Sequence, residues 1–186
     1  MTHLIDSITI KNQNISMILD KTIANPDISR NELRSIVLNT IKRRSDVFKI
    51  STIRYIIELY NTHVFDGRLD GVCIDVRWNR CFSHWAADCS GMDNKIILRL
   101  STKLFSHELV NVFGFDAKYL TKLEILMLIV EHELVHGITQ LFYKRRYVSI
   151  RKGVDQTHNY YFMRTVKRLF GHTTHQIVYD DKKTHI

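Results

Sequence analysis

Residues 120–142 read LTKLEILMLIVEHELVHGITQLF, and this stretch decides the fold. Apolar residues recur through it at helical spacing, so it predicts one long, largely buried helix. Within it stands His132-Glu133-Leu134-Val135-His136, the pattern HExxH. Histidines four residues apart lie on one face of a helix, so both imidazoles can reach one zinc ion while Glu133 addresses a water beside it.

The HExxH pattern carries real information, because a chain of this composition is expected to contain roughly 0.02 such matches by chance. A catalytic zinc ion takes three protein ligands and keeps one position open, so a third ligand must lie downstream. His158 is the leading candidate, because it stands at the start of the next predicted helix. His172 and His175, beyond the Gly171 helix stop, and the shorter-reaching Asp155 are the alternatives.

Hydrophobic periodicity outside this helix predicts the rest of the architecture. Residues 1–50 are an irregular or helical lead-in, with a capping box at 29–32 that opens a helix to about residue 44. A second helix runs from residue 51 to the turn at 66–67, and a third covers 160–170. Alternating patterns at 72–78 and 96–101, with a strand between them at 81–89, predict a small antiparallel three-stranded sheet. The order of helices, sheet and helices indicates an α+β fold.

Length and composition restrict the class of protein. A chain of 186 residues, 45% hydrophobic and with one proline, forms one globular domain with a small appendage rather than a disordered segment. The longest apolar run, residues 125–130, is too short to span a membrane, and residues 1–6 do not resemble a signal peptide. Three cysteines do not make a disulfide framework. We therefore expect an intracellular protein, cytoplasmic or nuclear, with no membrane partner.

Positive charge is concentrated beside the predicted metal site. The formal net charge is +8, which favours a polyanionic partner. Residues 141–171 contain Asp155 as their single acidic residue and eight basic ones: Lys144, Arg145, Arg146, Arg151, Lys152, Arg164, Lys167 and Arg168. Tyrosines interleave with them, a combination that suits phosphate contact and base stacking, so single-stranded or distorted DNA is the predicted partner. The alternative is a solvated helix face and loop.

The order of these features resembles the SprT-like zinc metalloprotease family, whose Spartan-type members degrade proteins crosslinked to DNA. The resemblance covers about residues 53–180. It rests on the Asn61 helix with its Gly67-x-Leu69 turn, on strand segments at 76–79, 86–90 and 97–101, and on HExxH. Residues 158–162, HNYYF, occupy the place of the family's His-Gly-x-x-Phe segment, although an asparagine and a tyrosine replace its usual glycine and proline.

The resemblance implies a minimal zincin-like domain at residues 51–186 behind a helical extension at 1–50. It assigns one zinc ion to His132, His136 and His158, and the general base to Glu133. The implied activity is a zinc-dependent endopeptidase, stimulated by DNA and acting on proteins bound or crosslinked to DNA. A DNA-independent zinc peptidase and a catalytically inactive, zinc-stabilised nucleic-acid-binding module are the alternatives.

The sequence suggests two further hypotheses, one about substrate binding and one about oxyanion stabilisation. The strand at residues 95–101 is predicted to offer its edge to an extended substrate, with plain core as the alternative. Tyr143, Tyr160, Tyr161 and His84 are candidate oxyanion donors, and spacing does not choose among them.

Overall fold

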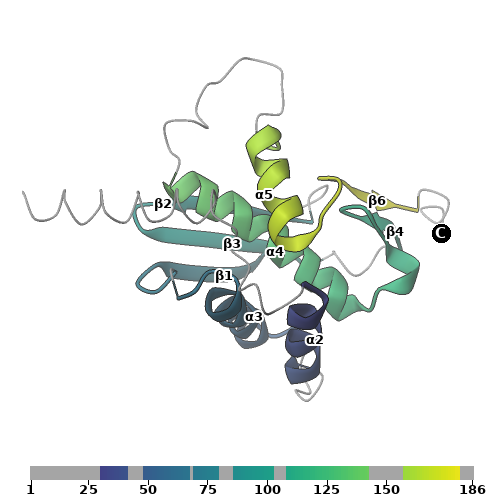
Figure 1. The fold of residues 1–186 in the computed structure, drawn as a ribbon, viewed down its shortest axis with the longest axis horizontal. Coiled ribbons are helices and arrows are strands. Elements are labelled where there is room, and N and C mark those ends of the chain that lie inside the picture. Colours follow the sequence, from purple (N-terminus) through teal and green to yellow (C-terminus); the bar gives the residue numbers. More distant parts are fainter. Residues whose placement is uncertain are drawn as a thin grey trace, which may run out of the picture.

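The structure, a computed structural model, describes residues 30–41, 48–67, 69–79, 86–102, 108–142 and 157–180. Its elements, in chain order, are α2 (Arg30–Ile41), α3 (Ile50–His63), β1 (Cys73–Asn79), β2 (Ala87–Met92), β3 (Lys95–Ser101), β4 (Leu109–Val112), β5 (Phe115–Asp116), the 3-10 turn η1 (Ala117–Tyr119), α4 (Lys122–Phe142), α5 (Tyr160–Phe170) and β6 (Ile177–Tyr179) (Figure 1). The predicted α+β class is confirmed. Among these helices, none has the length and apolarity needed to cross a membrane.

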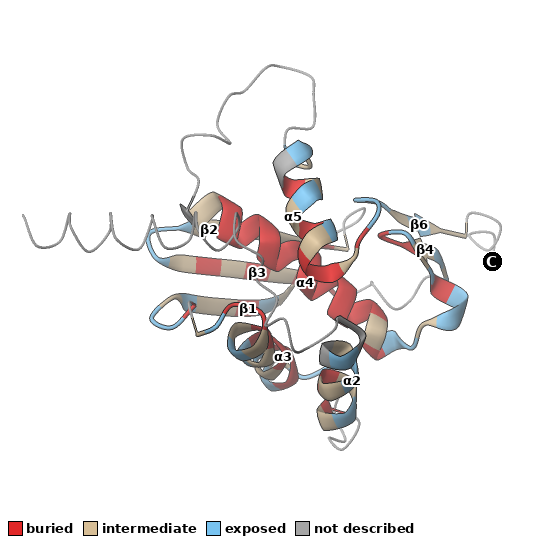
Figure 2. Cartoon of the chain, viewed as in Figure 1, coloured by how far each residue is buried: buried red, intermediate tan, exposed pale blue. Residues whose placement is uncertain are grey.

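Helix α4 is the centre of the molecule. It begins at a capping box: the Thr121 amide donates to the Glu124 carboxylate at 2.7 Å, and the Glu124 amide donates back to the Thr121 hydroxyl at 3.2 Å. The helix packs across β2 and β3 and also contacts α3 and α5. Figure 2 shows it buried along most of its length. Side chains on α4 are therefore held by neighbours on several sides.

The first sheet is mixed, so the prediction of an antiparallel sheet is wrong. Its strand order is β1-β3-β2, with β2 antiparallel to β3 and β1 parallel to it. Strands β2 and β3 form a hairpin through Asp93 and Asn94, both at positive φ, as a tight two-residue turn requires. Strand β3 carries the fully buried Ile96, Leu98 and Leu100. The most apolar strand thus takes the central place, and β1 lies beside it rather than beside β2.

The central place of β3 also overturns the prediction that this strand offers a free edge. The predicted middle strand is displaced as well: β2 begins at Ala87, and residues 80–85 lie outside the described residues. A second sheet, of order β5-β4-β6, was not predicted. Strand β4 has four residues, β5 has two and β6 has three, and strands this short show no recognisable period in the sequence.

The helices that precede the sheets belong to the same core as α4. Helix α3 packs against β1 and buries Ile53 and Ile56, and α2 packs on α3 and buries Val37 and Ile41. Helix α2 ends at Ile41, and residues 42–47 lie outside the described residues. The described part of residues 1–50 is therefore attached to the molecule by buried apolar surface.

Candidate metal centre

Three histidines that are distant in the sequence meet at one point. His132 and His136 project from successive turns of α4, and His158 lies just before α5. The His132 and His136 Nε2 atoms are 3.2 Å apart, those of His132 and His158 are 3.1 Å apart, and those of His136 and His158 are 3.0 Å apart. The sequence prediction that these three side chains come together is confirmed.

Hydrogen bonds among the imidazoles do not account for this triangle. Each Nε2 carries either a hydrogen or a lone pair, so with three nitrogens at least one pair must present two hydrogens or two lone pairs to each other. A metal ion removes that conflict by accepting all three lone pairs. Nitrogens about 2.0–2.1 Å from a tetrahedral zinc ion lie about 3.3 Å apart, close to the spacing observed. The triad can hold a metal ion.

Local structure around His158 explains how a residue outside α4 reaches the site. Asn159 is the N-cap of α5, and its side chain accepts a hydrogen bond from the Phe162 amide at 3.1 Å. Phe162 is fully buried, and its ring stacks on His136 with centroids 4.1 Å apart. The hydroxyl of Thr157 lies 3.3 Å from Nδ1 of His158. The helix start, rather than a flexible loop, thus places the third imidazole.

The burial of the site shifts the pKa values of His132 and Glu133 in the directions that favour their neutral forms. Burial lowers the pKa of His132 far below its usual range, and the neighbouring histidines lower it further, so its Nε2 lone pair is available to a metal. Burial, with a smaller contribution from Asp88, raises the pKa of Glu133 to about 8. A cation at the triad would stabilise the carboxylate and lower that pKa again.

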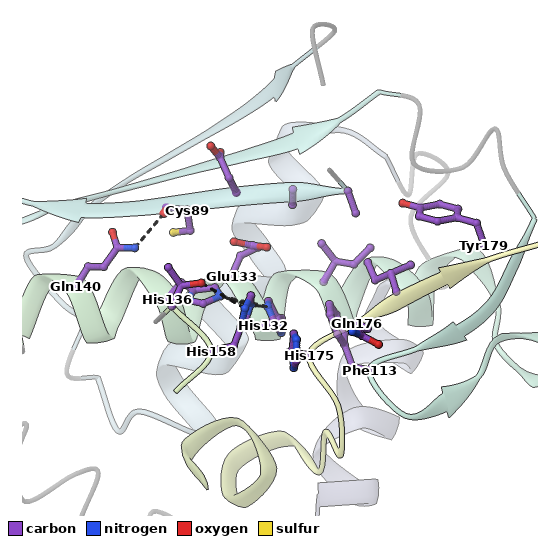
Figure 3. Close-up of a pocket in the computed structure, with 16 residues that line it drawn as sticks. Cys89, Phe113, His132, Glu133, His136, Gln140, His158, His175, Gln176 and Tyr179 are labelled. Carbon is purple, nitrogen blue, oxygen red and sulfur yellow. Dashed lines mark hydrogen bonds between the residues drawn. The ribbon is translucent and has the colours of Figure 1, made fainter. Parts of the chain in front are cut away.

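The triad and Glu133 open into a cleft of about 660 Å³ (Figure 3). One wall is β2, from Ala87 to Cys89, and the opposite wall is the segment from His175 to Tyr179. Glu133 lies between the triad and β2, as Figure 3 shows. Part of the lining is apolar and includes Ile129 and Ile177. A chain that crosses the cleft would therefore pass the triad, Glu133 and an apolar surface.

A buried carboxylate, Glu131, precedes His132 in the sequence. Glu131 is 2% exposed and accepts a 2.6 Å hydrogen bond from the Tyr60 hydroxyl. Its other oxygen lies 2.8 Å from Nε2 of His172 and 3.4 Å from Nη2 of Arg34. Burial, and then Glu131 itself, raises the pKa of Tyr60, so the phenol stays protonated and donates. Glu131 thereby links α2, α3 and the chain after α5 to the helix that carries the triad.

The alternative third ligands have other positions. His172 is fully buried and engages Glu131, and His175 is outside the triad although it lines the cleft. The His175 ring stacks on His158 with centroids 4.6 Å apart. Asp155 lies outside the described residues.

The other predicted site residues are only partly described. Tyr160 is 71% exposed and is not among the residues that line the cleft; Tyr143 and His84 lie outside the described residues, as does the side chain of Tyr161. Of the eight basic residues, Arg164 and Lys167 are exposed on α5 and Arg168 is half-buried there. The other five, Lys144, Arg145, Arg146, Arg151 and Lys152, are outside the described residues.

Several residues of the site were missed by sequence reasoning. Gln140 bridges to β2: its Oε1 accepts from the Gly91 amide at 2.9 Å, and its Nε2 donates to the Cys89 carbonyl at 3.4 Å. Phe113 lines the cleft from the tip of the β4–β5 hairpin. Glu131 did offer a signal, since a charged residue in an otherwise apolar helix needs a buried partner. Phe113 and Gln140 offered none, because their partners are distant in the sequence.

Comparison with known proteins identifies no family for this chain. No family model matches it, and neither a curated protein nor a solved structure matches it. The class that fold and site define is an α+β domain with a three-histidine site able to hold a metal ion.

Proposed function

We propose that this chain is a zinc-dependent endopeptidase of SprT type. The observation that carries the proposal is the convergence of three Nε2 atoms within 3.2 Å of one another, in a cleft that Glu133 also lines. Three imidazoles with one open position are the ligand set of catalytic zinc, whereas structural zinc sites are closed by four protein ligands. The HExxH spacing supports the same conclusion independently.

The proposed chemistry is hydrolysis of a peptide bond. His132, His136 and His158 would hold a zinc ion, which supplies Lewis-acid activation of a water molecule and of the peptide carbonyl. The Glu133 carboxylate accepts the proton from the attacking water and delivers it to the departing amine. The buried position of Glu133 between the triad and β2 keeps it close to both partners of this transfer.

Within the described residues no strand pairs with the outer side of β2, and this edge supports an extended polypeptide as substrate. Ser101 donates a backbone hydrogen bond to the Ala86 carbonyl, so the alternation along β2 turns the backbone groups of Ala87 and Cys89 away from β3. The Cys89 carbonyl already accepts a hydrogen bond from the Gln140 side chain. The backbone of Ala87, which lines the cleft, is therefore the point where a substrate strand can pair. Recognition through the main chain gives broad sequence tolerance, and it needs a locally unfolded substrate.

DNA is the proposed partner, on the basis of charge. Arg164 and Lys167 project from α5, the helix whose first turn follows the ligand His158. DNA bound along this helix would be held close to the cleft. A DNA-bound protein would then meet the triad at a high local concentration.

One assay separates this proposal from its alternatives. The purified zinc-loaded protein and its Glu133→Gln variant are incubated with a DNA-binding protein substrate, with and without single-stranded DNA. Cleavage that needs DNA and falls by about 10²–10⁴ in the variant is expected, because the proton carrier is lost while the ligands remain. Cleavage indifferent to DNA would favour a DNA-independent zinc peptidase. Salt-sensitive DNA binding without cleavage would favour the inactive nucleic-acid-binding module.

The DNA surface has its own control. We expect Arg164→Glu to weaken binding of single-stranded DNA and to flatten its salt dependence, because phosphate contacts release counterions. Arg54→Glu on the exposed side of α3 is the matched change of charge elsewhere, and we expect it to have a much smaller effect. Equal losses in the two proteins would show that net charge alone is responsible, and would remove α5 as the DNA surface.

A further inference from the structure

Phe113 has a backbone conformation that its side chain disfavours. It lies in the turn between β4 and β5 with φ at 52°, in the left-handed region. The other non-glycine residues at positive φ among the described residues are Asp66, Asp93 and Asn94, types that tolerate this region. A bulky aromatic residue there costs energy, and such a cost persists only where the surroundings enforce it.

The surroundings do enforce it. The Phe113 amide donates to the Gln176 carbonyl at 3.0 Å, and the Phe113 carbonyl accepts from the amides of Thr173 and Thr174 at 3.0 and 3.3 Å. The next residue, Gly114, lies so close to Thr173 that a Cβ atom there would overlap the Thr173 hydroxyl. The hairpin tip is thus fixed to the segment that follows α5.

The ring held in this way lies against a metal ligand. Phe113 is 3% exposed, and its ring is parallel to His132 within 2°, with centroids 4.2 Å apart. It is also parallel within 8° to His172, at 5.0 Å, and His172 is itself fixed by Glu131. Figure 3 shows Phe113 beside the triad on the side away from His136.

Among the described residues, no protein group gives His132 the outer hydrogen bond that metal-binding histidines usually make. A histidine that ligates through one ring nitrogen normally donates from the other to a carboxylate, carbonyl or water, and this bond fixes the ring. Nδ1 of His132 is buried and has no hydrogen-bond partner among the described residues. Packing supports the orientation of this imidazole, and Phe113 provides the parallel face.

We propose that Phe113 is the positioning residue of the ligand His132, with ring stacking in place of the usual outer hydrogen bond. The inference rests on the metal site of the proposed function. A metal ion withdraws electrons from the imidazole it binds, so an aromatic face against that ring becomes more favourable when the ion is present. The site therefore requires an aromatic ring at position 113, and an apolar side chain without a ring does not replace it.

The test measures metal binding rather than catalysis. Metal-free protein is titrated with Co²⁺, whose visible absorption reports ligand geometry. Phe113→Leu keeps an apolar side chain without a ring, and Phe113→Tyr keeps the ring. Phe65→Leu is the matched control, because Phe65 is 2% exposed, its ring packs edge-on against Phe170, and it does not line the cleft. Urea unfolding of each metal-free protein reports the loss of packing.

We expect Phe113→Leu to weaken Co²⁺ binding about tenfold and to change the absorption spectrum, as loss of an outer support does in other metal sites. Phe65→Leu should lower the unfolding midpoint by a similar amount and leave Co²⁺ affinity and spectrum unchanged, and Phe113→Tyr should bind like the wild type. Equal Co²⁺ affinity in Phe113→Leu and the wild type would overturn the role of Phe113, and so would an equal loss of Co²⁺ affinity in Phe65→Leu. Neither result would count against the metal site itself. Failure of the wild type to bind Co²⁺ would overturn the proposed metal site.

Discussion

The three histidines of the triad direct their Nε2 atoms to the same point, and packed neighbours surround each ring. Burial keeps His132 neutral, Thr157 lies against the outer nitrogen of His158, and Phe162 stacks on His136. His175 lies as close to the cleft as any ligand, yet it stands outside the triad. This difference allows a sharp test of the ligand set.

We expect His132→Ala, His136→Ala and His158→Ala each to reduce bound zinc from about one per chain to a small fraction, because two imidazoles bind zinc far more weakly than three. His175→Ala should keep its zinc, since that ring only stacks on His158. Elemental analysis after dialysis against a weak chelator measures the metal content. Full occupancy in His158→Ala, or loss of zinc in His175→Ala, would require a different third ligand.

At the scale of elements, the contact between α4 and β2 determines how the triad meets the cleft. Gly137 follows the ligand His136, and a Cβ atom there would lie 2.8 Å from both the Cys89 sulfur and Cγ2 of Ile96. Across this contact, a Cβ atom at Gly91 would overlap the Gly137 carbonyl oxygen. The two glycines let helix and strand approach closely, and Gln140 then bridges the same pair of elements.

Gly137→Ala is therefore expected to destabilise the protein by about 1–3 kcal/mol, the usual cost of overpacking a core. In a solvent-exposed helix the same change stabilises by about 1 kcal/mol, so a loss of stability indicates the close contact between α4 and β2. Urea unfolding of the metal-free protein gives the free energy. A more stable variant would mean that α4 does not approach β2 as closely as the structure shows.

Across the whole molecule, helix α2 belongs to the same packed structure as the site. Val37 and Ile41 of α2 are fully buried, and Arg34 of the same helix reaches Glu131, the neighbour of His132. The sequence predicted this helix but not the surface it packs against, because an amphipathic pattern indicates that one face is buried without indicating what covers it.

Val37→Ala is expected to lower the free energy of unfolding by about 1–3 kcal/mol, because it leaves a cavity in the core. Asn39→Ala, an exposed change on the same helix, should alter it by less than about 0.5 kcal/mol. Thermal or urea unfolding of both variants measures the difference. Equal stability of Val37→Ala and the wild type would show that α2 is not part of the cooperative core.

From the sequence alone, the elements with strong periodicity and the two histidines on one helix could be predicted. Helix α4 was predictable because 3.6-residue spacing and the HExxH pair are local properties, and α5 was predictable from its apolar spacing and from Gly171, which ends it in the left-handed conformation. His158 could be proposed as the third ligand from its place before that helix. Local spacing could not place its imidazole within 3.2 Å of the other two.

The tertiary structure alone decided the contacts between segments distant in the sequence. The central place of β3, the stacking of Phe113 on His132 and the burial of Glu131 among α2, α3 and His172 join residues separated by tens of positions. No local period records such pairs, because the free energy that favours them arises only when the surfaces meet and exclude water. The three histidines of the triad could therefore be predicted from the chain, whereas the residues that pack around them could not.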